Sequence, residues 1–276
     1  GRCVLERDVV GGVPVWRGGL EQPVSGGMAG GCDVLLVTSR DGMLHSFGLD
    51  GERRWSTALA SESVSPVAAD QDRVYVHTID GRLTAYQRDN GEQLWTYEHA
   101  MPVLSVRGTS SPLILDQLVL TGFASGKVVA LDKRLGVPRW NVRLAIPDGR
   151  SELERLVDID GTPVLDNGVV YAASYHGKVA ALSPRGDVRW QEDGSSYGHP
   201  ELALGSLYLS LDDGTVKAYD LYNGAGQWQQ VLLQGKALGQ VTAFDRYLAV
   251  ADDEGFLYLL SQVDGELLLR QRLRPK

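Results

Sequence analysis

Hydrophobic and polar residues alternate along most of the chain, in short runs that end at glycine-containing turns. Residues 80–95 ("DGRLTAYQRDNGEQLW") show the pattern: an alternating run, an Asn-Gly pair, and a second run that ends on tryptophan. Alternation with a period of two is typical of a half-buried β-strand, and Asn-Gly between two such runs is a strong hairpin signal. We therefore expect a chain of short antiparallel strands.

This segment recurs along the whole chain. In six of its seven copies a tryptophan follows the turn glycine by four residues, and the last copy has Leu269 there. The copies are residues 1–16, 41–55, 80–95, 125–140, 176–190, 213–228 and 254–269. The tryptophans at this position, which are all six in the chain, are Trp16, Trp55, Trp95, Trp140, Trp190 and Trp228. Because every tryptophan has the same position within its copy of the segment, the sequence indicates a structural repeat.

The tryptophans are interpreted as packing positions of the repeat. A large aromatic side chain placed once per unit would fill the space between neighbouring units, where its burial contributes roughly 1.5–3 kcal/mol. The alternative is ligand stacking, which would place the rings together on one exposed face.

The tryptophans lie 38 to 50 residues apart, and two further strand-like runs precede each copy, such as residues 65–70 and 73–79. Four short antiparallel strands per 40 residues describe a blade of a β-propeller. We expect an all-β fold and a single β-propeller domain over 1–276. Six blades are expected to be complete, at about 23–59, 64–99, 109–145, 160–194, 197–233 and 238–273. Residues 1–20 supply two more strands, so the expectation is a fragment that lacks the first strands and the last blade of a closed ring.

Two connections between blades are longer than the others. From a tryptophan to the next strand-opening glycine there are 24 to 27 residues in four units, but 31 after Trp95 and 37 after Trp140. The extra residues fall in 99–112 and 145–163. Both connections leave an outer strand and enter the next inner strand, so we expect them side by side on one face. Within the second, Ser151 and Glu154 have capping-box spacing, which predicts one or two helical turns.

These two connections carry the candidate site. The first contains an apolar run that ends in Arg107, and the second contains Asp158 and Asp160. Apolar groups, an arginine and two aspartates on neighbouring loops could form a protein-binding patch. Alternatively, Arg107 pairs with one aspartate and joins the loops. A third reading is a cation site, because Asp-x-Asp-Gly resembles the start of a calcium loop, although the later ligands are absent.

Composition narrows the function further. The chain is 43% hydrophobic and 22% charged, with a net charge of -8 and a pI of about 5.2. An acidic chain without a Lys/Arg cluster is not expected to bind nucleic acid. The chain has no run of about 18 apolar residues, so its sequence predicts no membrane-spanning helix. The five histidines are scattered, and neither a G-x-S-x-G elbow nor a phosphate-binding loop is present. We therefore predict no catalytic residue, no cofactor and no metal. Cys3 and Cys32 are either buried thiols or one disulfide.

The repeat, an apolar-x-Ala-apolar strand followed by Gly-x-x-x-Trp, resembles the pyrroloquinoline-quinone-type propeller repeat. Within that superfamily the chain resembles, over essentially its whole length, the BamB family of lipoproteins of the outer-membrane β-barrel assembly machinery. The most specific stretches are "PVLSVRGTSSP", "GRSELERLVDIDGTPV" and "GFLYLLSQVDGE". The resemblance implies an eight-bladed propeller, of which about six and a half blades are present here. It also implies a lipid anchor on an N-terminal cysteine absent from this chain, since Cys3 lies within an expected strand.

The resemblance further implies a non-catalytic scaffold at the periplasmic face of the outer membrane. Such a scaffold binds the POTRA domains of BamA, assists the folding and insertion of outer-membrane proteins, and could contact nascent ones. The family's Leu-x-Leu-Arg and Asp-x-Asp segments match Leu104, Val106, Arg107, Asp158 and Asp160, with Val106 where the family usually has leucine.

Two other classes remain open. A quinone-dependent dehydrogenase would share the repeat, but it needs a central calcium, a catalytic aspartate and, in the best-known alcohol dehydrogenases, adjacent cysteines. This chain has no Cys-Cys pair. A carbohydrate- or peptide-binding propeller is the third option.

Overall fold

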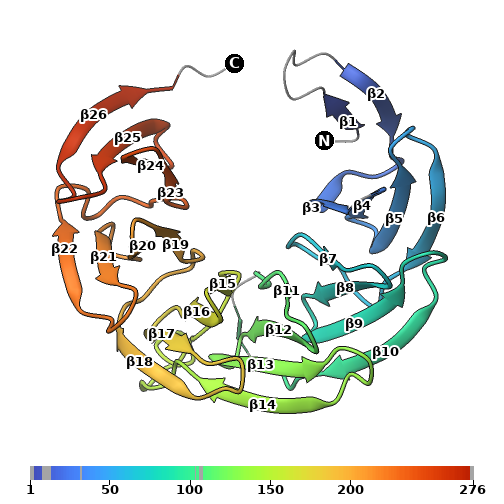
Figure 1. The fold of residues 1–276 in the computed structure, drawn as a ribbon, viewed down its shortest axis with the longest axis horizontal. Coiled ribbons are helices and arrows are strands. Elements are labelled where there is room, and N and C mark those ends of the chain that lie inside the picture. The colour runs from blue at the N-terminus through green and yellow to red at the C-terminus, as the bar shows by residue number, and fades with distance from the viewer. Residues whose placement is uncertain (1–2, 8–13, 32, 103, 106–107, 274–276) are drawn as a thin grey trace. The chain divides into compact units, whose positions relative to one another are not determined.

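The computed structural model describes residues 3–7, 14–31, 33–102, 104–105 and 108–273. The described residues form short β-strands and contain no helix. They are arranged in six four-stranded sheets and one two-stranded sheet, and the strand pairs are antiparallel. The predicted all-β fold of four-stranded antiparallel sheets is therefore confirmed (Figure 1).

The chain divides into two compact units. Unit 1 comprises residues 1–101, 107–121 and 131–139, and unit 2 comprises residues 102–106, 122–130 and 140–276. One sheet contributes residues to both: β11 (Leu113–Ile114), β12 (Leu118–Phe123), β13 (Lys127–Asp132) and β14 (Pro138–Arg143).

Unit 1 contains the two-stranded sheet and two complete four-stranded sheets. The two-stranded sheet is β1 (Cys3–Arg7) and β2 (Pro14–Gly19). The next sheet is β3 (Val24–Gly31), β4 (Val34–Ser39), β5 (Met43–Gly48) and β6 (Arg53–Ala58). It is followed by β7 (Ala68–Ala69), β8 (Arg73–Thr78), β9 (Arg82–Gln87) and β10 (Gln93–Glu98).

Unit 2 contains three complete four-stranded sheets. The first is β15 (Val164–Asp166), β16 (Val169–Ala173), β17 (Lys178–Leu182) and β18 (Val188–Asp193). The second is β19 (Glu201–Ala203), β20 (Ser206–Ser210), β21 (Val216–Asp220) and β22 (Gly226–Gln230). The third is β23 (Thr242–Phe244), β24 (Tyr247–Ala251), β25 (Phe256–Ser261) and β26 (Leu267–Arg272).

Burial follows the position of a strand within its sheet. All five residues of β16 are buried, and Tyr171 and Ala173 of this strand lie in the core shared with the following sheet. The fourth strand, such as β10 or β14, alternates between exposed and partly buried residues, because only one of its faces is covered. In unit 2 the fourth strands β18, β22 and β26 form the outer side of the unit (Figure 1).

The core of unit 2 lies between the facing sides of consecutive sheets. Tyr171, Ala181 and Trp190 from the β15–β18 sheet pack against Leu207 and Tyr219 of the next sheet. Each large side chain buried there stabilises the fold by roughly 1.5–3 kcal/mol.

The repeated alanine has a direct role beside the tryptophan. In three sheets the residue paired with the tryptophan across the strands is an alanine. These pairs are Ala85 with Trp95, Ala181 with Trp190, and Ala218 with Trp228. A methyl group leaves room for the indole ring on that face of the sheet.

The tryptophans reach the following sheet in chain order. Five of them donate a hydrogen bond from the indole Nε1–H to a backbone carbonyl of that sheet, at 2.9–3.1 Å. The accepting carbonyls belong to Arg88, Lys133, Pro184, Leu221 and Gln262. This polar contact fixes the ring of each tryptophan against its neighbour.

The turn glycine of the following sheet lies directly beside each ring. Gly91 has φ +73°, and a Cβ there would stand 2.5 Å from the ring of Trp55. The same close approach joins Gly51 to Trp16 in unit 1 and Gly224 to Trp190 in unit 2. Glycine is required there for two reasons, the left-handed backbone and the adjacent ring.

Candidate functional site

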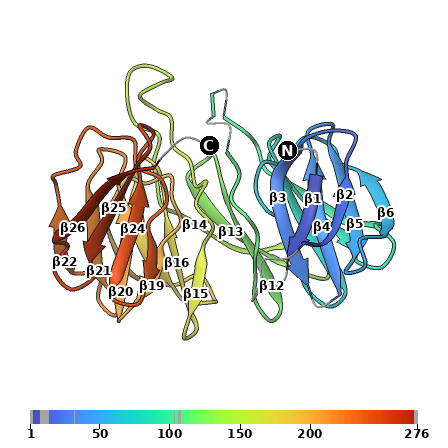
Figure 2. The ribbon, with the colours of Figure 1, turned by 90° about the horizontal axis from the view of Figure 1, so that it is seen from above.

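The connection from β14 to β15, residues 144–163, lies in unit 2 and extends beyond the ends of the strands (yellow-green in Figure 2). Its first two residues, Leu144 and Ala145, are buried, while residues 146–155 are exposed. The chain becomes buried again at Val157. The insertion therefore has an exposed tip and a buried base.

The exposed tip forms the predicted capping box without a helix. Glu154 N–H donates to Ser151 Oγ, and Glu154 Oε2 accepts from the backbone N–H groups of Ser151 and Arg150. These N–H groups, first that of Arg150 and then that of Ser151, lower the pKa of Glu154. One turn follows, with Arg155 N–H bonded to Ser151 O at 3.1 Å. Leu156 N–H is bonded to Leu153 O at 3.3 Å, so the tip forms two overlapping hydrogen-bonded turns and no helix.

Asp158 and Asp160 lie at the buried base. Between them, Ile159 is fully buried and occupies the space where a Cβ on Gly122 would lie. Asp158 forms an isolated antiparallel bridge with Tyr175 and accepts its N–H at 2.8 Å. Residues directly opposite each other in an antiparallel pair point to the same side, so the Asp158 and Tyr175 side chains share a face.

The two carboxyl groups are short of hydrogen-bond donors. Asp158 is only 2% exposed, and its Oδ1 accepts from the N–H of Ile159 at 2.8 Å. Asp158 Oδ2 and Asp160 Oδ1 are buried without a hydrogen-bond partner among the described residues. A buried carboxylate without a partner is costly, and such atoms are rare in folded proteins.

Burial raises the pKa of both groups, and the neighbouring charge of Asp160 raises that of Asp158 further. Burial, followed by the charge of Asp160, raises the pKa of Asp158 to about 8. Burial also raises the pKa of Asp160 to about 6. A cation brought to this pair would relieve both effects, because an opposite charge favours the ionised form. The pair is therefore suited to bind a positively charged group.

The other predicted binding residues are only partly described. Leu104 is 44% exposed, which leaves its side chain free to contact a partner. Val106 and Arg107 lie outside the described residues, as does Cys32.

An aromatic stack beside the aspartates was not predicted from the sequence. The ring of Tyr175 stacks on His176 at 3.8 Å and on Tyr197 at 4.0 Å between centroids. His176 has φ +50° at a hairpin position where the other repeats have Asp, Ser or Glu before glycine. That unusual residue in the repeat is the one sequence signal that could have drawn attention to this hairpin.

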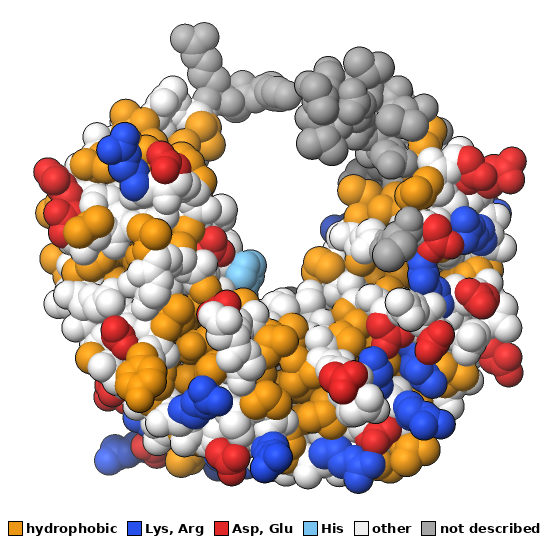
Figure 3. Space-filling view, in the orientation of Figure 1, with side chains coloured by type: hydrophobic (Ala, Val, Ile, Leu, Met, Phe, Trp, Pro, Cys, Tyr) orange, Lys and Arg blue, Asp and Glu red, His pale blue; other side chains and the backbone are white. Residues whose placement is uncertain are grey.

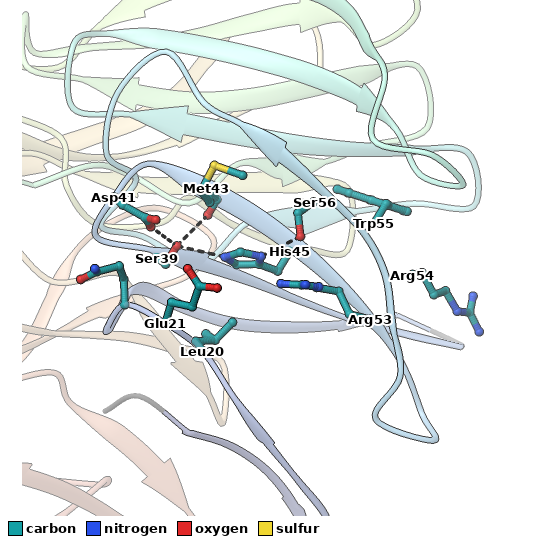
Figure 4. A pocket seen from close by; sticks show the side chains of 11 residues that line it. Leu20, Glu21, Ser39, Asp41, Met43, His45, Arg53, Arg54, Trp55 and Ser56 are labelled. Carbon is teal, nitrogen blue, oxygen red and sulfur yellow. Dashed lines mark hydrogen bonds between the residues drawn. The ribbon is translucent and has the colours of Figure 1, made fainter.

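Unit 1 holds a cavity of about 420 Å³ with residues that suggest catalysis (Figure 4). Ser39 Oγ donates to Asp41 Oδ1, and the ring nitrogens of His45 lie 3.1 Å from Ser39 Oγ and 2.9 Å from Ser56 Oγ. In a Ser-His-Asp triad the carboxylate holds the imidazole. Here the carboxylate holds a serine instead, so the triad geometry is not formed.

The next sheet of unit 1 explains these contacts. There Thr78 Oγ1 donates to Asp80 in the same turn, as Ser39 does to Asp41. The cross-strand partners of that sheet are Thr84 and Thr96, whose hydroxyl oxygens lie 3.1 Å apart, as His45 is paired with Ser56. The side chains around His45 therefore occupy the ordinary turn and cross-strand positions of the repeat. His45 takes the position that Thr84 has in the next sheet.

The surface chemistry is mixed elsewhere. Acidic and basic side chains are interspersed over the face shown in Figure 3. In the part of the chain that the structure describes, no group of three or more His, Cys, Asp or Glu side chains could hold a metal ion. The described residues include no helix long and apolar enough to cross a bilayer.

Comparison with known proteins identifies the relatives of the chain. A family model described as "Outer membrane protein assembly factor BamB" matches residues 4–230 and 212–276. A relative of that name from Pseudomonas aeruginosa is 42% identical over 177 residues, which are 64% of this chain and 47% of the relative. Another from Nitrosomonas eutropha is 32% identical over 97% of this chain and 66% of its own length. The chain thus spans between about half and two thirds of these relatives.

A solved structure agrees with the sequence comparison. The crystal structure of BamB from Moraxella catarrhalis superposes with a TM-score of 0.90 and 30% identity, over 96% of this chain and 81% of that one. This similarity, together with the four-stranded antiparallel sheets, confirms the predicted β-propeller. The chain therefore belongs to the family of the outer membrane protein assembly factor BamB.

Proposed function

We propose that this chain is a non-catalytic scaffold in the assembly of outer-membrane proteins and works at the periplasmic face of the outer membrane. Its relatives are named outer membrane protein assembly factors, which supports this role. In this role it binds the POTRA domains of BamA and also contacts nascent outer-membrane proteins. In the full-length protein a lipid anchor holds the propeller at the membrane.

One observation carries the choice of binding site. Asp158 is buried and Asp160 is half-buried beside it, and each has a buried oxygen without a hydrogen-bond partner, on the connection that exceeds the repeat length most. Two carboxyl groups with unpartnered oxygens do not stabilise the fold of the isolated chain. A cationic group on a partner would supply the missing hydrogen bonds and charge.

The predicted binding residues have two different roles. Leu104, exposed at 44%, and Val106 supply apolar contact, and Arg107, Asp158 and Asp160 supply charge-assisted hydrogen bonds and orientation. Apolar anchors surrounded by a few desolvated charges are typical of binding hot spots.

The direct test is binding of the separated POTRA domains to the immobilised chain, measured by biolayer interferometry. We expect Arg107→Ala, or Asp158→Ala combined with Asp160→Ala, to weaken binding at least about thirtyfold. Removing one partner of a buried charged hydrogen bond costs about 2–5 kcal/mol.

The matched control is Asp187→Ala. Asp187 is an exposed aspartate of unit 2 that accepts a hydrogen bond from Ser183 in a hairpin turn, far along the sequence from both connections. It should bind like the wild type, and circular dichroism should show that all variants keep the strand content. Unchanged binding by both site variants rejects the proposed site.

A further inference from the structure

A cleft lined in part by Tyr197 forms a second candidate site in unit 2. It is about 350 Å³ in volume and lies among the connection before β19, the turn after β20 and the connection before β23. Tyr197, Asp212, Gly239 and Gln240 are among the residues that line it. Its volume is at the small end of ligand pockets, which suits a single side chain better than a large ligand.

The aromatic wall of the cleft is held in place. Tyr197 stacks on Tyr175 with the two rings 18° from parallel, and its side chain is still 43% exposed. Burial, the contact with Tyr175, and the charges of Asp212 and Asp160 all raise the pKa of Tyr197, so its phenol stays neutral. A neutral, fixed tyrosine ring with an open side attracts a cation through its π-electrons.

The carboxylate wall is held as well. Ser195 Oγ donates to Asp212 Oδ2 at 2.7 Å, and the same hydroxyl accepts the N–H of His176 at 2.8 Å. The backbone N–H of Asp212 is bonded to Ser195 O at 3.0 Å. These bonds fix the direction of the carboxylate before any ligand arrives, which lowers the entropy lost on binding.

In the described part of unit 2, Asp212 forms no ion pair. The ion pairs of this unit use Arg155, Lys178, Lys236 and Arg246, and none of these contacts Asp212. Burial lowers the pKa of His199, so this imidazole is neutral at pH 7. An aromatic face and an oriented carboxylate thus stand together without a cation.

We propose that this cleft binds an arginine side chain of a partner protein, with the guanidinium stacked on Tyr197 and paired with Asp212. A planar guanidinium can stack on a ring and donate two hydrogen bonds to a carboxylate at once, whereas an ammonium group cannot. The subsite excludes Asp158 and Asp160, so it can fail while the proposed function holds.

The test uses the full chain and the peptide Ac-Gly-Arg-Gly-NH2, followed by NMR. We expect a dissociation constant of roughly 1–10 mM, typical of one stacked ion pair near the surface, with shifts at Tyr197 and Asp212. The lysine peptide should bind at least about threefold more weakly, and the citrulline peptide, which has the same shape without charge, should not bind measurably.

Two variants locate the site. Tyr197→Leu and Asp212→Asn should each weaken arginine binding at least about fivefold, because each removes one of the two walls. Asp187→Asn is the matched control, since that aspartate also accepts a hydrogen bond from a serine hydroxyl. Asp212→Asn keeps the size of the side chain, so it remains informative if Tyr197→Leu disturbs the fold.

The outcomes separate this subsite from the proposed function. Equal binding of the citrulline peptide, or binding that neither variant changes, overturns the arginine subsite. POTRA binding that survives both the Arg107 and the Asp158/Asp160 variants rejects the proposed binding site, whereas the peptide result alone supports or overturns the cleft.

Discussion

Asp158 and Asp252 are both buried in unit 2, yet their surroundings are opposite. Asp252 Oδ1 accepts from Phe256 N–H at 2.8 Å, and its Oδ2 accepts from Tyr258 OH at 2.7 Å and lies 3.2 Å from Lys236 Nζ. Asp158 has one backbone donor and a second carboxyl group as its neighbour.

The difference is visible in the acidity of the two groups. Burial alone would raise the pKa of Asp252, but its bonds to Phe256, Tyr258 and Lys236 outweigh burial and lower it. The pKa of Asp158 is raised because its one hydrogen bond, from Ile159 N–H, does not outweigh burial and the charge of Asp160. A buried carboxyl group with a full set of partners belongs to the fold, whereas one without them costs stability and is retained for another reason.

Removal of Asp252 should give the largest effect. Asp252→Ala leaves Lys236, the Tyr258 hydroxyl and the Phe256 N–H without their acceptor. We expect the midpoint of thermal unfolding to fall by about 5 °C or more. Differential scanning calorimetry measures it, with Asp253→Ala, the exposed neighbour, as a control that should stay near the wild type. An unchanged midpoint would remove the basis of the comparison.

Asp158→Asn should have a smaller effect of opposite sign. The raised pKa means that the folded chain holds a proton on Asp158 which the unfolded chain, with an ordinary pKa near 4, releases. The contribution of Asp158 to the free energy of unfolding is therefore largest below about pH 4, and it declines as the pH rises towards about 8. Asparagine mimics the protonated form. The free energy of unfolding of the variant should therefore rise relative to that of the wild type by at most about 1.4 kcal/mol per pH unit in this window.

Urea unfolding at pH 5, 6, 7 and 8 measures this gain. Asp187→Asn, at an exposed aspartate, should show no such trend. A variant that is less stable than the wild type at every pH would mean that Asp158 has a cationic partner within this chain.

Asp160→Asn sharpens the same comparison with a smaller effect. The charge of Asp160 contributes to the raised pKa of Asp158 after burial, so its removal should lower that pKa while leaving it above the ordinary value. Titration of the Asp158 side-chain carboxyl by 13C NMR measures the change. No movement would show that burial alone controls Asp158.

The repeat explains why the fold could be predicted and the partners of Asp158 could not. Alternation, Asn-Gly turns and the Gly-x-x-x-Trp phase are local patterns, and they lead directly to four-stranded sheets with a ring over each turn glycine. The Tyr175–Tyr197 stack joins residues from a hairpin and from the next inter-sheet connection. Such a contact depends on how two sheets pack, which no local pattern contains.

The long connections show the same division. Their excess length is visible from the spacing of tryptophans and glycines, and it marks the segment that holds Asp158 and Asp160. Whether those carboxyl groups are partnered, as Asp252 is, depends on side chains from other strands. The segment after Ser151 forms hydrogen-bonded turns but no helix, because starting a helix is unfavourable and residues 146–155 are exposed.

The smallest effect concerns this exposed tip, which should be independent of the buried pair. Glu154→Gln weakens the acceptor for the backbone N–H groups of Arg150 and Ser151. Because the tip is exposed, the unfolding midpoint should not change measurably, but these two amides should exchange with solvent about two- to fivefold faster. Hydrogen exchange measured by NMR tests this, with Leu144 N–H, bonded to Gly126 O, as the internal reference. If the amide exchange of Asp158 and Ile159 also accelerates, the tip supports the buried base, and the carboxyl groups of Asp158 and Asp160 depend on the capping box for their position.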